Sequence, residues 1–309
     1  MNKLLFKDAY NQYLKYIENR LKLQSKESIK YKFKDIILPY FKNYNIYEIK
    51  ENDYIEFQNI INKKNYSYNY KKNIHFTISG FLNYCIKFLN LEENIAKKVG
   101  CFKKLNERKK EQNFYNNKEF KKFIKNINEK VYKQFFILMF LTGTRPGEAM
   151  ALKFSDLKKY YIDINKTISE HGKREINSPK SLTSYRKISI DKKLYKELIN
   201  LKNEYDKKYN YKNYDYFIFG GIKPLSPTSI NRRKEKACKL ANIKKIKLHE
   251  FRHSHATLLL NKKIIINEIS KRLGHSDVSI TLNTYTHTSK LQEKRVIKTL
   301  SLIRLFQNF

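Results

Sequence analysis

The 309-residue chain carries 65 Lys and Arg but only 29 Asp and Glu, which gives a formal charge of +36. This excess predicts a polyanionic partner, nucleic acid first, although Lys, Asn, Ile and Tyr are also the residues that an AT-rich genome favours. The length favours two domains, and the sequence has neither an 18-residue apolar run nor a signal peptide, so we expect a cytoplasmic protein that does not enter a membrane.

Residues 1–92 carry apolar side chains at helical spacing, in one stripe near the start and another near the end. The stripes are Phe6, Ala9, Tyr10, Tyr13, Leu14 and Ile17, and then Ile74, Ile78, Phe81, Leu82 and Ile86. Two further helices are predicted within 29–41 and 51–64. We therefore expect a bundle of four helices whose Lys-rich outer faces could lie against DNA.

Residues 93–113 break this pattern and are dense in charge, which predicts a linker and places a second domain at 114–309. Three well-separated cysteines predict reduced thiols rather than a disulfide framework or a cysteine zinc site; they are Cys85, Cys101 and Cys238.

The second domain is predicted to be mainly α with a small antiparallel β-sheet. Its helices are expected at 117–127, 130–144, 196–209, 229–242, 249–255 and 265–273. Residues 160–170 and 185–190 carry β-branched and aromatic residues at short alternating spacing, which predicts strands on either side of a polar turn at 177–180. A last amphipathic stretch carries Val296, Leu300 and Ile303 on one face.

The stretch HEFRHSHATLLL, residues 249–260, contains the pattern His-Glu-x-x-His, by which a helix presents two imidazoles to zinc beside a glutamate base. A zinc hydrolase also needs a third ligand. Ala256 and Leu259 stand where the common extension needs Gly and His, which leaves Glu268 as the candidate. Arg252 would place a fixed positive charge within one turn of the metal, so the sequence favours another chemistry.

The same stretch contains His-x-x-Arg, which predicts a phosphate site. His249 and Arg252 project from one side of a helix, and Arg binds phosphate oxygens in a planar fork without losing its proton. TGTRPGEAMALKFSDL adds Arg145 at a helix start, with Pro146 suited to the first helical position and Glu148 able to orient the guanidinium.

A third stretch, RLGHSDVSITLNTYTH, places His275 after a Gly-containing turn and Tyr285 ten residues later. Together, TGTRPGE, LHEFRHSHAT and this stretch resemble the three signature boxes of the tyrosine recombinase, or phage integrase, family in order and spacing. The resemblance covers the whole second domain. It implies an N-terminal helical core-binding bundle followed by an α+β catalytic domain.

The resemblance also implies six catalytic residues. They are Arg145, Lys180, His249, Arg252, His275 and Tyr285. Lys180 is the loosest match, since Lys173 and Lys187 lie close to it. His253 and His255 are expected to be structural, and Glu250 to stabilise its helix.

The family's chemistry needs these residue types. A tyrosine oxygen attacks phosphorus and stores the bond as a 3′-phosphotyrosine while a 5′-hydroxyl leaves. Two arginines neutralise the phosphate oxygens, the lysine protonates the leaving oxygen, His249 takes the tyrosine proton and His275 hydrogen-bonds the phosphate. No metal or other cofactor is required.

The resemblance therefore implies a site-specific DNA recombinase that integrates, excises or inverts DNA. The alternatives are a type IB topoisomerase-like relaxing enzyme and a DNA-binding protein that has lost catalysis. The implied partners are double-stranded DNA and further copies of the chain, as a tetramer on two DNA sites. We expect the simple two-domain form, without an arm-binding domain, and a final helix that docks on the neighbouring protomer through Val296, Leu300 and Ile303.

Overall fold

The computed structural model describes residues 3–103, 113–169, 175–179, 181–211 and 214–278. The chain divides into two units, residues 1–109 and 110–309. Each unit has a hydrophobic core of its own, which is the two-domain organisation that the length favours.

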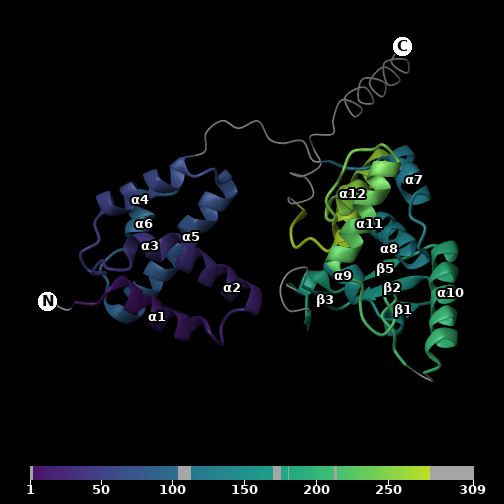
Figure 1. Cartoon of the computed structure of the whole chain (residues 1–309), viewed down its shortest axis with the longest axis horizontal. Coiled ribbons are helices and arrows are strands. Elements are labelled where there is room, and N and C mark those ends of the chain that lie inside the picture. Colours follow the sequence, from purple (N-terminus) through teal and green to yellow (C-terminus); the bar gives the residue numbers. More distant parts are fainter. Residues whose placement is uncertain (1–2, 104–112, 170–174, 180, 212–213, 279–309) are drawn as a thin grey trace, which may run out of the picture. The chain divides into compact units, whose positions relative to one another are not determined.

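Among its described residues, every named element of the first unit is a helix (Figure 1). Its elements are α1 (Phe6–Ile17), α2 (Leu23–Lys32), a π-helical segment (Phe33–Ile37), α3 (Leu38–Phe41), α4 (Glu51–Lys63), α5 (Tyr68–Leu89) and α6 (Ile95–Val99). The predicted stripes form its core: every stripe residue is buried except Leu14 and Ile86, which are partly buried. The helix predicted within 29–41 is the second part of a continuous helical run from α2 to α3.

The first unit extends past residue 92, where we expected a linker to begin. Ile95, Ala96 and Phe102 are buried in its core. The Asn94 amide donates to the Ser79 carbonyl over 2.9 Å, and the Gln58 amide donates to the Gly100 carbonyl over 2.8 Å. The expected boundary was too early because the dense charge of this segment lies on its outer side, which hides the few apolar residues that face inward.

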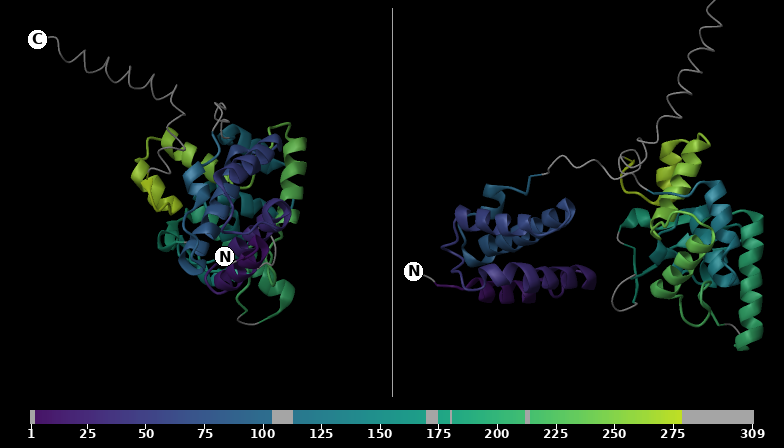
Figure 2. Two further views of the ribbon diagram at one scale, coloured as in Figure 1. Left: turned by 90° about the vertical axis from the view of Figure 1, so that its left-hand side faces the viewer. Right: turned by 45° about the horizontal axis from the view of Figure 1, so that its top comes forward.

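The second unit combines helices with short antiparallel strands (Figures 1 and 2). Its helices are α7 (Asn117–Lys125), α8 (Lys130–Thr142), α9 (Pro146–Ala151), α10 (Lys192–Tyr209), α11 (Pro227–Leu240), α12 (Glu250–Asn261) and α13 (Ile266–Leu273), with 3-10 turns at Phe154–Asp156 and Leu182–Ser184. Its strands are β1 (Leu157–Lys158), β2 (Tyr161–Ile164), β3 (Thr167–Ile168), β4 (Ile176–Asn177) and β5 (Arg186–Ser189).

The predicted antiparallel sheet is present in two pieces among the described residues. Strands β1, β2 and β5 form one piece in that order, in which Ile162 pairs with Ile188. Strands β3 and β4 form the other, in which Thr167 pairs with Asn177. Strands β3 and β4 come between β2 and β5 in the sequence, so the second piece is inserted into the first along the chain.

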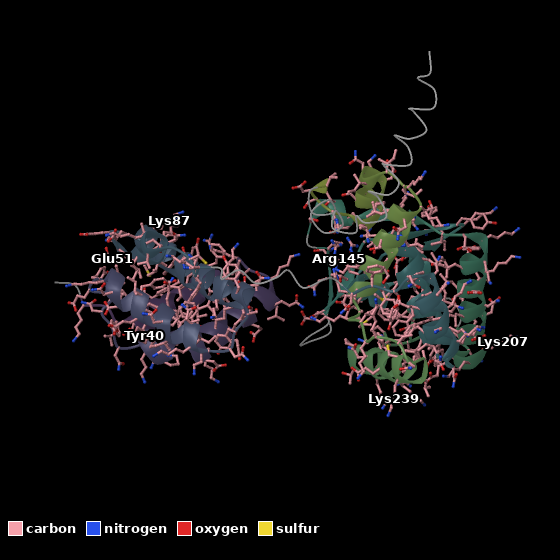
Figure 3. All side chains as sticks on the ribbon, turned by 90° about the horizontal axis from the view of Figure 1, so that it is seen from above. Tyr40, Glu51, Lys87, Arg145, Lys207 and Lys239 are labelled. Carbon is pink, nitrogen blue, oxygen red and sulfur yellow. The ribbon has the colours of Figure 1, made fainter. Side chains whose placement is uncertain are left out.

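Helix α8 is the centre of the second core. It is buried along most of its length and packs against α12, where Phe136 and Phe251 meet with ring centroids 5.3 Å apart. The outer surface is basic; Lys207 on α10 and Lys239 on α11 lie there (Figure 3). None of the helices in the described part of the chain is long and apolar enough to span a membrane.

Candidate active site

The turn between α8 and α9 presents Arg145. Gly143 caps the C-terminal end of α8 with a φ of +67°. A Cβ added to it would lie 2.6 Å from His255 Cδ2, so this position requires glycine. Arg145 is then the N-cap of α9, and Pro146 is the first helical residue, as the sequence predicts. The Glu148 carboxylate accepts a hydrogen bond from the Arg145 backbone N–H over 2.9 Å, which closes this helix start.

The same carboxylate holds the Arg145 side chain. Arg145 Nη1 donates to Glu148 Oε1 over 2.7 Å, so Glu148 orients the guanidinium as expected. Glu148 also accepts from Arg186, from Nη2 over 2.8 Å and from Nη1 over 3.1 Å. Burial by itself raises the pKa of Glu148, but hydrogen bonds to Arg186 and the positive charges of Arg186 and Arg145 outweigh it, so the pKa lies below its usual value.

His249 and Arg252 lie at the start of α12. His249 is the N-cap residue, and Arg252 lies in the first turn with only 1% of its surface exposed. The Arg252 guanidinium donates to the Gly143 carbonyl over 2.9 Å and to the Leu273 carbonyl over 2.7 Å. Arg252 therefore joins the C-terminal ends of α8 and α13.

His275 follows the end of α13, where three arginines converge. Gly274 caps the C-terminal end of α13, and its φ is +70°. Three successive backbone carbonyls at this end each accept a hydrogen bond from a different arginine. The carbonyl of residue 272 accepts from Arg186 Nε over 2.8 Å, and that of residue 273 accepts from Arg252 Nη2 over 2.7 Å. The carbonyl of residue 274 accepts from Arg145 Nη2 over 3.4 Å. The negative end of a helix favours cations, so this helix end gathers the guanidiniums beside His275.

Burial, together with these arginines, keeps the two histidines neutral. Burial, followed by the charges of Arg252, Arg145 and Arg186, lowers the pKa of His275 to about 4. Burial and the charges of Arg252 and Arg145 also lower the pKa of His249, and Glu148 opposes them in part. The site can therefore offer positive guanidiniums to an anion and a neutral imidazole to a proton at pH 7.

The structure thus brings four of the six predicted residues together: Arg145, His249, Arg252 and His275. Lys180, Tyr285 and the expected final helix with Val296, Leu300 and Ile303 lie outside the described residues, as does Lys173. Lys187 is exposed on β5, with Nζ 5.3 Å from the centre of the Tyr161 ring. Side chains alternate along a strand, so Lys187 points to the face opposite Arg186 and away from Glu148.

The zinc pattern of residues 249–253 lacks a third ligand in the described part of the chain. His249 and His253 lie close, with ring centroids 5.1 Å apart. Glu268, the candidate third ligand, instead pairs with Lys271 over 3.2 Å on the exposed side of α13. No group of three His, Cys, Asp or Glu residues among those described could hold a metal ion.

Sequence reasoning missed two arginines of this site, Arg186 and Arg272. Arg272 donates from Nε to His255 Nε2 over 3.2 Å and from Nη2 to the Leu141 carbonyl over 3.1 Å, and His255 is buried beside the Phe140 carbonyl, 2.9 Å from Nδ1. A signal for Arg186 was available. It stands two residues before the buried Ile188, on the inward face of its strand, where a cation needs a buried partner.

Comparison with known proteins identifies this arrangement. Residues 113–292 match the phage integrase family, and residues 5–62 match its N-terminal SAM-like domain. The chain belongs to the phage integrase family. It is 31% identical to the ICEBs1 integrase of Bacillus subtilis (strain 168) over 279 residues, which cover 86% of this chain and 74% of the relative. It is also 31% identical to the integrase of Staphylococcus phage L54a over 70% of this chain and 69% of that relative.

Solved structures share the fold. A Tn1549 transposon integrase in complex with transposon right end DNA superposes with a TM-score of 0.76 at 17% identity, over 96% of this chain and 100% of that one. A lambda integrase from a tetramer bound to a Holliday junction gives 0.66 at 18% identity, over 91% and 78%. As a member of the family, this chain is an enzyme that cleaves and rejoins DNA in site-specific recombination by the tyrosine mechanism.

Proposed function

We propose that the chain exchanges strands between two double-stranded DNA sites through Tyr285, assisted by Arg145, Lys180, His249, Arg252 and His275. The observation that carries this proposal is the convergence of Arg145, Arg252 and His275 at the end of α13. Two guanidiniums and two neutral imidazoles in one place suit a phosphodiester, whose charge is spread over two non-bridging oxygens.

Cleavage and rejoining need no external energy source, because each step replaces one phosphodiester bond with another. The Tyr285 oxygen attacks phosphorus and forms the P–O bond of a 3′-phosphotyrosine, while the bond to the 5′-oxygen breaks. His249 takes the tyrosine proton, and Lys180 gives a proton to the leaving 5′-oxygen. In the reverse step a 5′-hydroxyl attacks the phosphotyrosine, the protons return, and Tyr285 leaves as a phenol.

The arginines stabilise the transition state of both steps. Arg145 is held by Glu148 and Arg252 by two backbone carbonyls, so both guanidiniums are placed before DNA binds. Binding of the phosphate adds negative charge beside His249 and His275, which raises their pKa values and favours proton transfer to His249.

The first unit supplies the other DNA-binding surface in this proposal. Its helices carry Lys-rich outer faces, and the sequence of residues 104–112, which spans the boundary between the units, adds further basic residues. The family resemblance and two similar structures, an integrase on transposon DNA and an integrase tetramer on a Holliday junction, support a tetramer on two duplexes. We propose that this tetramer acts in the cytoplasm.

A duplex from the genomic flanks of the protein's own element, nicked near the cleavage site so that the broken strand end is lost, tests this proposal. We expect a covalent protein–DNA adduct with the wild-type chain, and no adduct but undiminished DNA affinity with Tyr285→Phe, which removes one oxygen. A persisting adduct with Tyr285→Phe would contradict the assignment. A second assay with two duplexes distinguishes recombination from relaxation, since a type IB topoisomerase-like enzyme would relax one supercoiled circle and join no second duplex.

A further inference from the structure

The Arg186 guanidinium makes four hydrogen bonds in the site. It lies on β5 with only 7% of the side chain exposed. Its two terminal nitrogens bind both oxygens of Glu148, which is the bidentate geometry that arginine alone provides. Its Nε donates to the Arg272 carbonyl over 2.8 Å, and its Nη1 also donates to the Ser184 carbonyl over 3.0 Å.

These contacts connect three segments of the proposed site. Glu148 holds Arg145, the Arg272 carbonyl belongs to the helix end that precedes His275, and Ser184 lies four residues after Lys180. The planar Arg186 guanidinium therefore fixes the segments that carry Arg145 and His275. It also binds the segment that follows Lys180.

The glycine at the end of α13 makes room for this contact. A Cβ on Gly274 would lie 2.9 Å from Arg186 Cδ and 2.9 Å from the Thr183 carbonyl oxygen, and the φ of +70° disfavours other residues as well. Arg186 thus packs directly under the turn that presents His275, in addition to its hydrogen bonds.

We propose that Arg186 is a positioning residue for strand cleavage, which acts mainly through Arg145, with a smaller contribution through the His275 turn, and does not itself touch the phosphate. This inference rests on the proposed function of those residues. A lysine at this position would keep the positive charge but lose the planar fork that reaches the Glu148 carboxylate and the helix end at once. A displacement of catalytic groups by about 1 Å can cost about 100-fold in rate.

A purely structural role makes different predictions. If Arg186 only stabilised the domain, its replacement would lower the melting temperature, but folded molecules would cleave normally. Its effect would also be independent of Arg145. A positioning role instead lowers the cleavage rate of folded, DNA-saturated protein, and most of the effect disappears once Arg145 is already impaired.

The test is a double-mutant cycle with Arg186→Lys, Arg145→Lys and both together, in the full chain. Single-turnover cleavage of the nicked duplex is measured at saturating protein, and DNA affinity is measured separately. We expect Arg186→Lys to cleave about 100-fold more slowly, with unchanged affinity, and to add no more than about twofold in the Arg145→Lys background. Lys166→Met is the control, because it breaks a partly buried ion pair of this unit, with Asp156, that contacts none of the site residues named above. This variant should lose stability and keep the cleavage rate.

Two results would overturn the inference: a rate for Arg186→Lys within about twofold of the wild type, or losses that simply multiply in the double variant. If Arg145→Lys itself cleaved normally, that result would contradict the proposed function, in which Arg145 is catalytic. A failure of the proposed function can therefore be distinguished from a failure of the inference about Arg186. If Arg186→Lys does not fold, Glu148→Asp tests the same link, because it keeps the charge and shortens the bridge by one methylene. It should slow cleavage and preserve affinity, and an unchanged rate would contradict the inference.

Discussion

Replacing Glu148 by glutamine should destabilise the second unit strongly. Glu148 is 3% exposed and accepts hydrogen bonds from two guanidiniums and one backbone N–H. Glutamine has nearly the same shape but presents at most one carbonyl oxygen to them and turns N–H donors toward other donors. Two guanidiniums then lose their anionic partner.

The size of the effect follows from burial. The Arg186–Glu148 pair is 7% and 3% exposed, and removing one partner of such a buried pair costs about 3 to 5 kcal/mol. The pair with Arg145 adds little, because the Arg145 side chain is 35% exposed and its charge is screened by solvent. For a unit of this size, about 3 kcal/mol lowers the melting temperature by roughly 6 to 12 °C.

The pH dependence has a definite sign. The folded-state pKa of Glu148 is lowered, so its stabilisation is fully present above the unfolded pKa and is lost as the pH falls through the folded pKa. The difference between wild type and Glu148→Gln should therefore be constant around neutral pH and shrink below about pH 4.

Scanning calorimetry at pH 7 and at acid pH measures both quantities. Asp206→Asn is a matched control, because it removes one carboxylate from an exposed pair with Lys202 on α10 and should change stability by under about 1 kcal/mol. If Glu148→Gln melted within about 2 °C of the wild type at pH 7, roughly what 1 kcal/mol produces in a unit of this size, the buried ion-pair network would not contribute as argued.

Three further predictions concern proton transfer, charge and assembly. Lys180→Ala should cleave a substrate with a 5′-bridging sulfur nearly as well as the wild type, since sulfur leaves without a proton; equal defects on oxygen and sulfur substrates would make Lys180 only a phosphate contact. The His275 imidazole should titrate near pH 4 in the free protein and at higher pH in the DNA complex when followed by NMR, and an identical pKa in both would place His275 away from the phosphate. Deleting residues 290–309 should leave a soluble, DNA-binding protein that forms no two-duplex complex, and normal assembly or unfolding would rule out docking on a neighbouring protomer.

The parts of the fold that the sequence predicts well are those with a repeating pattern. The helical stripes of α1 and α5 identify buried positions correctly except at Leu14 and Ile86, which are partly buried, because a period of 3.6 residues defines a buried face without knowledge of its partner. The segment from Ile95 to Phe102 was missed because only three buried residues stand among charged ones, too few for a period.

The site residues that belong to the three local motifs could be predicted from the sequence. Those whose roles depend on long-range contacts could not. Pro146 and Glu148 predict the start of α9, because both lie within the four-residue stretch that begins at Arg145. Arg186 binds a carbonyl of α13 and Arg272 binds a carbonyl of α8, and both carbonyls are distant in sequence from the arginine. A local sequence pattern does not predict which group will pair with a buried cation. An inward-facing arginine on a short strand nevertheless signals that such a partner exists.

Identification of the residue that becomes linked to DNA tests the central claim most directly. Wild-type protein is trapped on the nicked duplex, the adduct is digested with protease and nuclease, and the nucleotide-bearing peptide is sequenced by mass spectrometry. We predict one modified peptide, spanning residues 273–290 in whole or part, with the 3′-phosphate on Tyr285. A modified residue other than Tyr285 would contradict the account, as would cleavage of DNA with no covalent peptide.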